Sequence, residues 1–365
     1  ALYTAYIGDS VAVLDRHHPP TRAVLVTSAL AALGLSFAFG TGAVWLLGHG
    51  NPRTALVYAV MLVLWLVEDT FRRLFIARLE FWKLVGNDLT YLLGTVFGFC
   101  GLFLVTGEVT LTLLFGAMLL GAAAAVLAGI LAVPRAELSR LRPGVAGMRA
   151  VVSFAGWRSL QGALRPTALL LSRTLVANLV TLAAVGVLEA GRLVVAPLQV
   201  VINGAGSFLL AGFAAGERSG SAETRHLARR ASVLLVAVTA LGGAGMAVLA
   251  GPVGQLMTGT AVRPLLVLGW TAYLAAWAAG LPYVTEVVAR RRSRAVFVTR
   301  LVDSVIGLCL VVIALALGAG VVTVPWAMAV GGGYSAWRLR RLAIDTRPVA
   351  DPARERGEPG PAQDS

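Results

Sequence analysis

The stretch QGALRPTALLLSRTL, residues 161–175, places Arg165 and Arg173 in a segment that otherwise has the apolar composition of a membrane-spanning helix. The guanidinium group of arginine keeps its charge in proteins. An arginine at the centre of a bilayer therefore costs about 2.5 to 3.5 kcal/mol on insertion scales. Two such residues in one helix indicate that the charges have a partner or a function.

The whole chain has the composition of an integral membrane protein. Of its 365 residues, 58% are hydrophobic and 13% are charged, and the mean hydropathy is +0.80. Its apolar runs are about 20 residues long, which is the length of a helix that crosses a hydrocarbon layer of about 30 Å. About ten spans are predicted, at residues 23–47, 54–74, 86–106, 110–133, 152–179, 183–213, 231–251, 262–284, 297–317 and 320–337.

The connections between these spans alternate between two kinds. One kind is rich in arginine, as in PRAELSRLRPG (134–144) and ARRRSR (289–294), whereas the other, as in TGEVT (106–110), is almost free of it. By the positive-inside rule the arginine-rich connections are cytoplasmic. The net charge of +13 is thus a topology signal, and we expect a multi-pass protein of the cytoplasmic membrane with no nucleic-acid partner.

The two ends of the chain differ from the spans. Residues 1–14 are too short for a span and are interrupted by Gly8 and Asp9, so we expect them to be the end of a helix whose start is missing. The tail from residue 341 is rich in Pro, Gly and charge, and we expect it to be disordered in the cytoplasm. Cys100 and Cys309 lie in apolar runs, where we interpret them as small packing residues. Neither a metal site nor a cofactor is predicted.

Two consecutive spans each present a polar face. At about 100° per residue, Gln161 and Arg165 lie on one side of the first span, with Arg173 about 80° round the helix. The polar residues of the next span fall within an arc of about 80°, and Pro197 among them should kink that helix. We expect both faces to line one water-filled cavity that suits a phosphate-bearing ligand. The candidate residues are Gln161, Arg165, Arg173, Glu189, Arg192, Gln199 and Asn203.

Several of these charges also have a structural interpretation. Arg173 is as well explained by pairing with Glu189 as by a ligand, and Arg192 is three residues from the same carboxylate. Arg165 lies about 10 Å deeper than Arg158, so it reaches neither membrane surface easily, and we favour a functional role for it. For the remaining charged residues we favour local ion pairs. Arg300 would pair with Asp303, Glu68 with Arg72, and Asp69 with Arg73.

Two long stretches resemble a known family. These are EDTFRRLFIARLEFWKLVGNDL (68–89) and ALRPTALLLSRTLVANLVTLAAVGVLEAGRLVVAPLQVVINGAGSFLL (163–210). They are similar to polysaccharide flippases of the multidrug/oligosaccharidyl-lipid/polysaccharide (MOP) exporter superfamily, and the resemblance covers most of the chain. One departure is Ser172, where that family often has Asp, so Arg173 lacks its usual neighbour.

The resemblance implies a MATE-like, all-α bundle of twelve helices in two pseudo-symmetric six-helix lobes, of which about ten spans are present. It divides the chain into an incomplete N-terminal lobe, an inter-lobe linker, a C-terminal lobe and the tail, at residues 1–133, 134–151, 152–340 and 341–365. It also implies that Arg165, Arg173 and Arg192 lie near a central cavity.

The function implied is transport without covalent chemistry. The resemblance suggests a flippase that moves a lipid-linked saccharide across the membrane by alternating access, with membrane lipid as a further partner. The drive is open between a coupling ion, the membrane potential and substrate supply. Two alternatives stay open. A drug/cation antiporter of the same superfamily should prefer buried carboxylates to arginines. A membrane-embedded saccharide polymerase or ligase would need catalytic outer loops, which here are only a few residues long.

Overall fold

The computed structural model describes residues 7, 10, 18–47, 51–135, 142–219, 224–259, 261–290 and 292–344. Within these residues the chain forms twelve α-helices and one short 3-10 turn, and no strand. The predicted all-α bundle is confirmed. Residues 341–344 extend the last helix instead of belonging to a tail. Most of the N-terminal stretch and residues 345–365 lie outside the described part, so the predictions for them stay predictions.

Within the described residues, four long helices form the first lobe. Asn51 caps one of them, since its side chain accepts hydrogen bonds from the backbone N–H groups of Arg53 and Thr54. The last two of these helices pack very closely. A Cβ atom added at Gly94 of one would lie only 2.9 Å from the Cα atom of Gly121 of the other. The helices are α2 (Pro19–Leu47), α3 (Pro52–Ala77), α4 (Phe81–Thr106) and α5 (Leu111–Ala132).

The turn between α3 and α4 belongs to the arginine-rich end of this lobe. Arg78 donates a hydrogen bond of 2.9 Å to the Oε1 atom of Glu80, and Lys83 lies 3.1 Å from its Oε2 atom. The bond from Arg78 lowers the pKa of the Glu80 carboxyl below its usual range. Glu80 therefore stays ionised and ties the turn together.

The second lobe is built around α12, which packs against α9, α10 and α14. Its Trp270 is almost completely buried and donates a hydrogen bond of 3.1 Å to the carbonyl oxygen of Leu188. On the other side, α13 packs against α7 and α14. The helices are α7 (Met148–Leu179), α8 (Leu182–Val194), α9 (Ala196–Ser219), α10 (Thr224–Val248), α11 (Ala250–Thr258), α12 (Pro264–Ala289), α13 (Ser293–Ala316) and α14 (Val324–Ile344), with the 3-10 turn η2 (Val321–Thr323).

A helix lies at each of the ten predicted spans. Eight of the described helices, α2 to α5, α9, α10, α12 and α13, are long and apolar enough to cross a membrane. The expected kink in residues 183–213 is a break at Val195, two residues before Pro197. The connection after residue 251 was predicted as a loop but contains α11. Cys100 and Cys309 are exposed, so their interpretation as packing residues is wrong. Both lie on helices apolar enough to cross a membrane, where a small apolar side chain can also face lipid.

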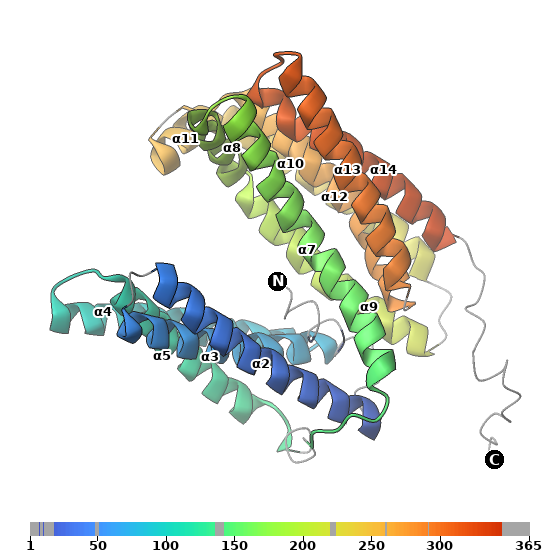
Figure 1. Cartoon of the computed structure of the whole chain (residues 1–365). Coiled ribbons are helices and arrows are strands. Elements are labelled where there is room, and N and C mark those ends of the chain that lie inside the picture. The colour runs from blue at the N-terminus through green and yellow to red at the C-terminus, as the bar shows by residue number, and fades with distance from the viewer. Residues whose placement is uncertain are drawn as a thin grey trace, which may run out of the picture.

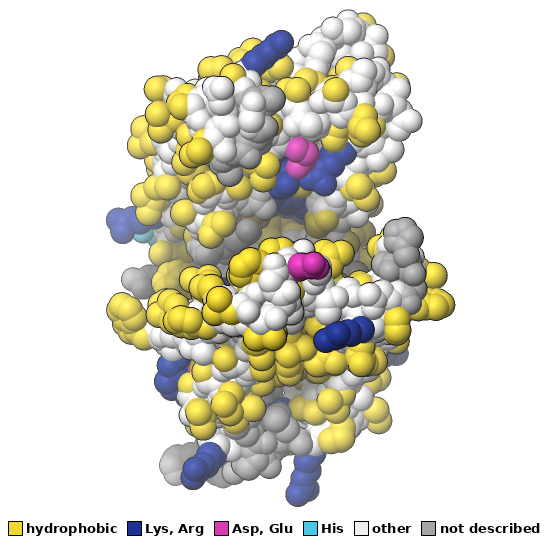
Figure 2. Space-filling view, turned by 90° about the vertical axis from the view of Figure 1, so that its left-hand side faces the viewer, with side chains coloured by type: hydrophobic (Ala, Val, Ile, Leu, Met, Phe, Trp, Pro, Cys, Tyr) yellow, Lys and Arg dark blue, Asp and Glu magenta, His cyan; other side chains and the backbone are white. Residues whose placement is uncertain are grey.

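The two lobes contact each other at their arginine-rich ends. Gly144, which precedes α7, donates its backbone N–H to the Thr27 hydroxyl of α2 at 2.8 Å. Phe81 at the start of α4 contacts Phe208 of α9, with ring centroids 5.5 Å apart. Away from these contacts the lobes diverge (Figure 1). Viewed into the diverging side, the space-filling surface is hollowed between the two halves (Figure 2). The molecule is thus closed at the arginine-rich end.

Candidate functional site

A cavity of about 1090 Å³ lies where the two lobes meet. Its wall comes from α3 and α4 of the first lobe and from α7, α9, α12, α13 and α14 of the second. Its charged lining residues are six arginines and one acid, namely Arg72, Arg73, Arg158, Arg165, Arg173, Arg300 and Asp303. The cavity is therefore lined mainly by positive groups.

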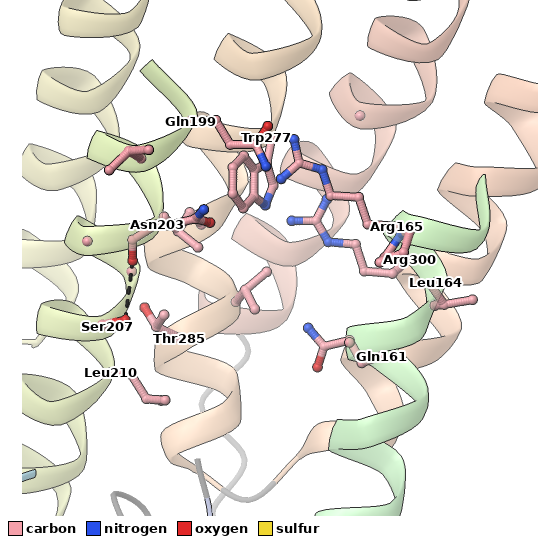
Figure 3. Close-up of a pocket in the computed structure, with 18 of the residues that line it drawn as sticks. Gln161, Leu164, Arg165, Gln199, Asn203, Ser207, Leu210, Trp277, Thr285 and Arg300 are labelled. Carbon is pink, nitrogen blue, oxygen red and sulfur yellow. Dashed lines mark hydrogen bonds between the residues drawn. The ribbon is translucent and has the colours of Figure 1, made fainter. Parts of the chain in front are cut away.

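Arg165 points into this cavity from the middle of α7 (Figure 3). Its guanidinium carbon lies 3.7 Å from the centroid of the Trp277 ring, and its Nε atom donates to the Tyr273 hydroxyl at 3.2 Å. Both aromatic residues belong to α12. Among the described residues, no carboxylate forms an ion pair with Arg165. The aromatic rings hold the cation in place without neutralising it.

Uncharged polar side chains complete the wall around Arg165. Gln161 lies one turn before it on α7, while Gln199 and Asn203 face it from α9 (Figure 3). The Oε1 atom of Gln161 is buried and has no hydrogen-bond partner among the described residues. Amides at these places donate and accept hydrogen bonds, so the wall suits a ligand that carries hydroxyl groups beside an anionic group.

Arg173 and Arg192 share the carboxylate of Glu189. The Arg173 guanidinium makes two contacts with it, at 2.7 and 3.1 Å, and Arg192 makes one at 2.8 Å. Only Arg173 of these three lines the cavity. Five of the seven candidate residues therefore share one cavity, whereas Glu189 and Arg192 do not line it, contrary to the prediction. Their place follows from the break at Val195, which separates α8 from the polar face of α9.

Arg300 is a cavity residue that the sequence did not single out as functional. Its Nη1 atom donates to the Oδ2 atom of Asp303 at 3.2 Å, as the i, i+3 spacing predicted. Both residues also line the cavity, and Arg300 lies beside Arg165 (Figure 3). The available signal was the depth of this charged pair within a span.

Arg72 and Arg73 form the first lobe's part of the wall. The predicted i, i+4 spacings are present, with Arg72 3.8 Å from Glu68 and Arg73 3.7 Å from Asp69. A closer contact, 2.7 Å, joins Arg72 to Asp88 of α4. This pair of arginines thus lines the cavity, whereas the acidic groups that contact it do not.

The sequence matches no protein-family model and no curated protein. Solved structures do match. The eukaryotic MATE transporter AtDTX14 superposes with a TM-score of 0.73 at 15% identity, over 97% of this chain and 85% of that chain. A MOP superfamily transporter from Pyrococcus furiosus matches with a TM-score of 0.64 at 13% identity, over 94% and 83%. The lipid II flippase MurJ matches with a TM-score of 0.51 at 13% identity, over 95% and 79%.

These neighbours confirm the resemblance to the MOP superfamily at the level of fold. The chain has the helical architecture that MATE transporters share with the lipid II flippase. The neighbours are transporters and a flippase, not enzymes. At identities of 13 to 15% the likeness concerns the fold alone, so the ligand must be inferred from the side chains of this cavity.

Proposed function

We propose that this protein is a transporter that moves a phosphate-bearing, lipid-linked saccharide across the cytoplasmic membrane. Two lobes surround a central cavity that is closed at the arginine-rich end. A rocking motion of one lobe against the other would close the opposite end and open this one, as alternating access requires. The headgroup would occupy the cavity while the lipid tail stays in the bilayer between the lobes.

Arg165 is the observation that carries this proposal. It is a half-buried guanidinium that faces the cavity, and among the described residues its contacts are aromatic. Its charge and part of its planar donor fork remain available to a ligand. Phosphate oxygens match that fork and replace the water that the guanidinium loses. An anionic headgroup is therefore the ligand that this site favours.

The neighbouring groups fit the same ligand. Gln161, Gln199 and Asn203 offer hydrogen bonds to saccharide hydroxyl groups. Arg173 and Arg300 add positive potential, although each already contacts a carboxylate. The arginines of α3 close the cavity from the other lobe, so both lobes would contact the headgroup. Contact with both lobes is what couples a bound ligand to their relative motion.

A drug/cation antiporter is the alternative that the fold also allows. An organic cation would need an accessible carboxylate, and Asp303 is the one acid among the described cavity residues. Arg300 already contacts Asp303. The Pyrococcus furiosus transporter is described as having a binding pocket of reverse polarity that suggests a different function. Pocket charge therefore separates ligand classes on this fold, and here the charge favours an anion.

The test is transport by Arg165 variants reconstituted in proteoliposomes with a fluorescent lipid-linked saccharide pyrophosphate. Hydrogen bonds to charged groups contribute about 1.5 to 3 kcal/mol, so Arg165→Ala should lower the transport rate by roughly 10- to 100-fold. Arg165→Lys should recover part of the rate, because lysine keeps the charge but lacks the fork. Arg53→Ala is the control, since Arg53 is exposed and lies outside the cavity.

The outcomes separate the two functions. Full transport by a normally abundant Arg165→Ala protein would overturn the proposal. A second pair of results would also overturn it and favour the antiporter. These results are unchanged saccharide transport by all Arg165 variants and efflux of a cationic dye that the Asp303→Asn substitution abolishes. A parallel loss of protein abundance and of transport would assign Arg165 a structural role instead.

A further inference from the structure

A second pocket, of about 510 Å³, lies outside the central cavity, between α13 and α14. It is found at the arginine-rich end of both helices. Arg292 immediately precedes α13, Arg294 is in its first turn, and Arg338 lies in the second half of α14. These three residues line the pocket together with Tyr334. The pocket and its charges are not used by the transport proposed above.

Among the residues that the structure describes, the three arginines of this pocket have no acidic partner. No carboxylate lines the pocket, and within the described residues none of the three takes part in an ion pair. The neighbouring Arg290 and Arg300, in contrast, each contact a carboxylate. Three unneutralised guanidinium groups around one pocket create a strong preference for an anion.

The other wall of the pocket is apolar and exposed. Val298 and Val302 of α13 line it and are 48% and 37% exposed. They belong to a helix that is apolar enough to cross a membrane. At 1.5 Å per residue, Val302 lies about 12 Å deeper than Arg294. The pocket thus runs from the level of the lipid headgroups into the hydrocarbon.

We infer that this pocket, named here the α13/α14 groove, binds an anionic phospholipid of the leaflet at the arginine-rich end. The guanidinium groups would contact the phosphate, the Tyr334 hydroxyl would reach the glycerol region, and an acyl chain would lie along Val298 and Val302. A free phosphate ion would satisfy only the arginines. The apolar continuation of the groove favours a lipid, and basic pockets between helices at this membrane level bind such headgroups.

Native mass spectrometry of the full chain, titrated with phosphatidylglycerol or with phosphatidylcholine of the same acyl chains, tests the inference. The wild type should retain phosphatidylglycerol preferentially. Each arginine near an anionic headgroup contributes roughly a five-fold factor in affinity. Replacing all three by glutamine should therefore weaken phosphatidylglycerol binding by about 100-fold. The three replacements are Arg292→Gln, Arg294→Gln and Arg338→Gln.

A second triple variant is the matched control. Arg149, Arg229 and Arg230 are exposed arginines of the same end of the molecule that lie outside the groove. Their replacement by glutamine removes the same charge and should leave phosphatidylglycerol binding within about two-fold of the wild type. An equal loss in both triple variants would overturn the inference in favour of non-specific attraction to anionic lipid.

Two further measurements keep the inference testable if the groove variant is unstable. Val298→Trp fills the apolar part without changing any charge and, at an exposed position, should leave the fold intact. It should reduce phosphatidylglycerol binding at least about three-fold. Glycerol phosphate should compete poorly with the lipid. Unchanged binding by Val298→Trp, or equal competition by glycerol phosphate, would overturn the assignment to a phospholipid.

Discussion

Arg72 of the first lobe and Arg165 of the second line the same cavity with different surroundings. In the first lobe, Arg72 lies within 4.0 Å of Glu68, Asp69 and Asp88, and the side chains of Glu68 and Asp69 are almost completely buried. In the second lobe, Arg165 lies on the ring of Trp277. Acidic groups balance the first arginine, whereas aromatic rings hold the second.

This difference separates a charge that is paired within the fold from a charge that remains available to a ligand. A buried ion pair stabilises a fold mainly because breaking it leaves one charge uncompensated. A cation–π contact that is partly or fully desolvated contributes about 1 to 2 kcal/mol and leaves the charge in place. We therefore expect substitutions behind Arg72 to change stability and substitutions around Arg165 to change transport.

The largest expected effect is on the stability of the first lobe. Glu68 accepts a hydrogen bond of 3.0 Å from the buried amide of Asn87 and lies 3.8 Å from Arg72. Glu68→Leu removes both interactions, while Asp69 and Asp88 still contact Arg72. The free energy of unfolding should fall by about 2 to 3 kcal/mol. Thermal denaturation of the purified protein in detergent measures this as a lower melting temperature.

Two variants make that measurement specific. Glu68→Gln keeps an acceptor for Asn87 and should lose about half as much stability. Glu108→Gln, at an exposed outer position, should leave the melting temperature unchanged. If Glu68→Leu has the melting temperature of the wild type while Arg165→Ala is strongly destabilised, the charges around Arg72 are not structural and the proposed difference between Arg72 and Arg165 is wrong.

The next effect concerns the ring that holds Arg165. Trp277→Leu removes the stack, and a desolvated cation–π contact is worth about 1 to 2 kcal/mol. Transport should fall by roughly 5- to 30-fold, mostly as a higher KM, because Arg165 remains but is no longer oriented. Trp277→Phe should recover part of the affinity. A lower maximal rate at unchanged KM, with no recovery by Phe, would contradict a positioning role for Trp277.

Much of the fold follows from composition and spacing. Apolar runs of the right length predicted a helix at each of the ten spans, and Pro197 predicted the break between α8 and α9. The helix α11 escaped prediction because nine residues with two glycines and a proline give no periodic signal of their own. Its formation depends on packing against α8 and α12.

The candidate site was only partly predictable. The depth of Arg165 in an apolar helix was enough to single it out. Arg72 and Arg300 were explained by partners three or four residues away, and those pairs are present. What local spacing could not show is that the same residues also face a cavity, because that depends on how α3 and α13 pack in the tertiary structure. Trp277 gave no signal, since an aromatic residue in a span has the same appearance whether it contacts lipid or a cation.

The smallest expected effects distinguish the two arginines that share Glu189. Their side chains and that of Glu189 are 26 to 32% exposed, so each pair should contribute no more than about 1 kcal/mol. Double-mutant cycles on thermal stability should give the larger coupling for Arg173, which contacts both carboxylate oxygens, and the smaller one for Arg192, which contacts one.

The effects of the two arginines on transport should follow a different order. Arg173→Ala should reduce it because Arg173 lines the cavity, whereas Arg192→Ala should leave it nearly unchanged because Arg192 is not among the cavity residues. Loss of transport in Arg192→Ala with normal transport in Arg173→Ala would show that Arg192, and not Arg173, contacts the ligand.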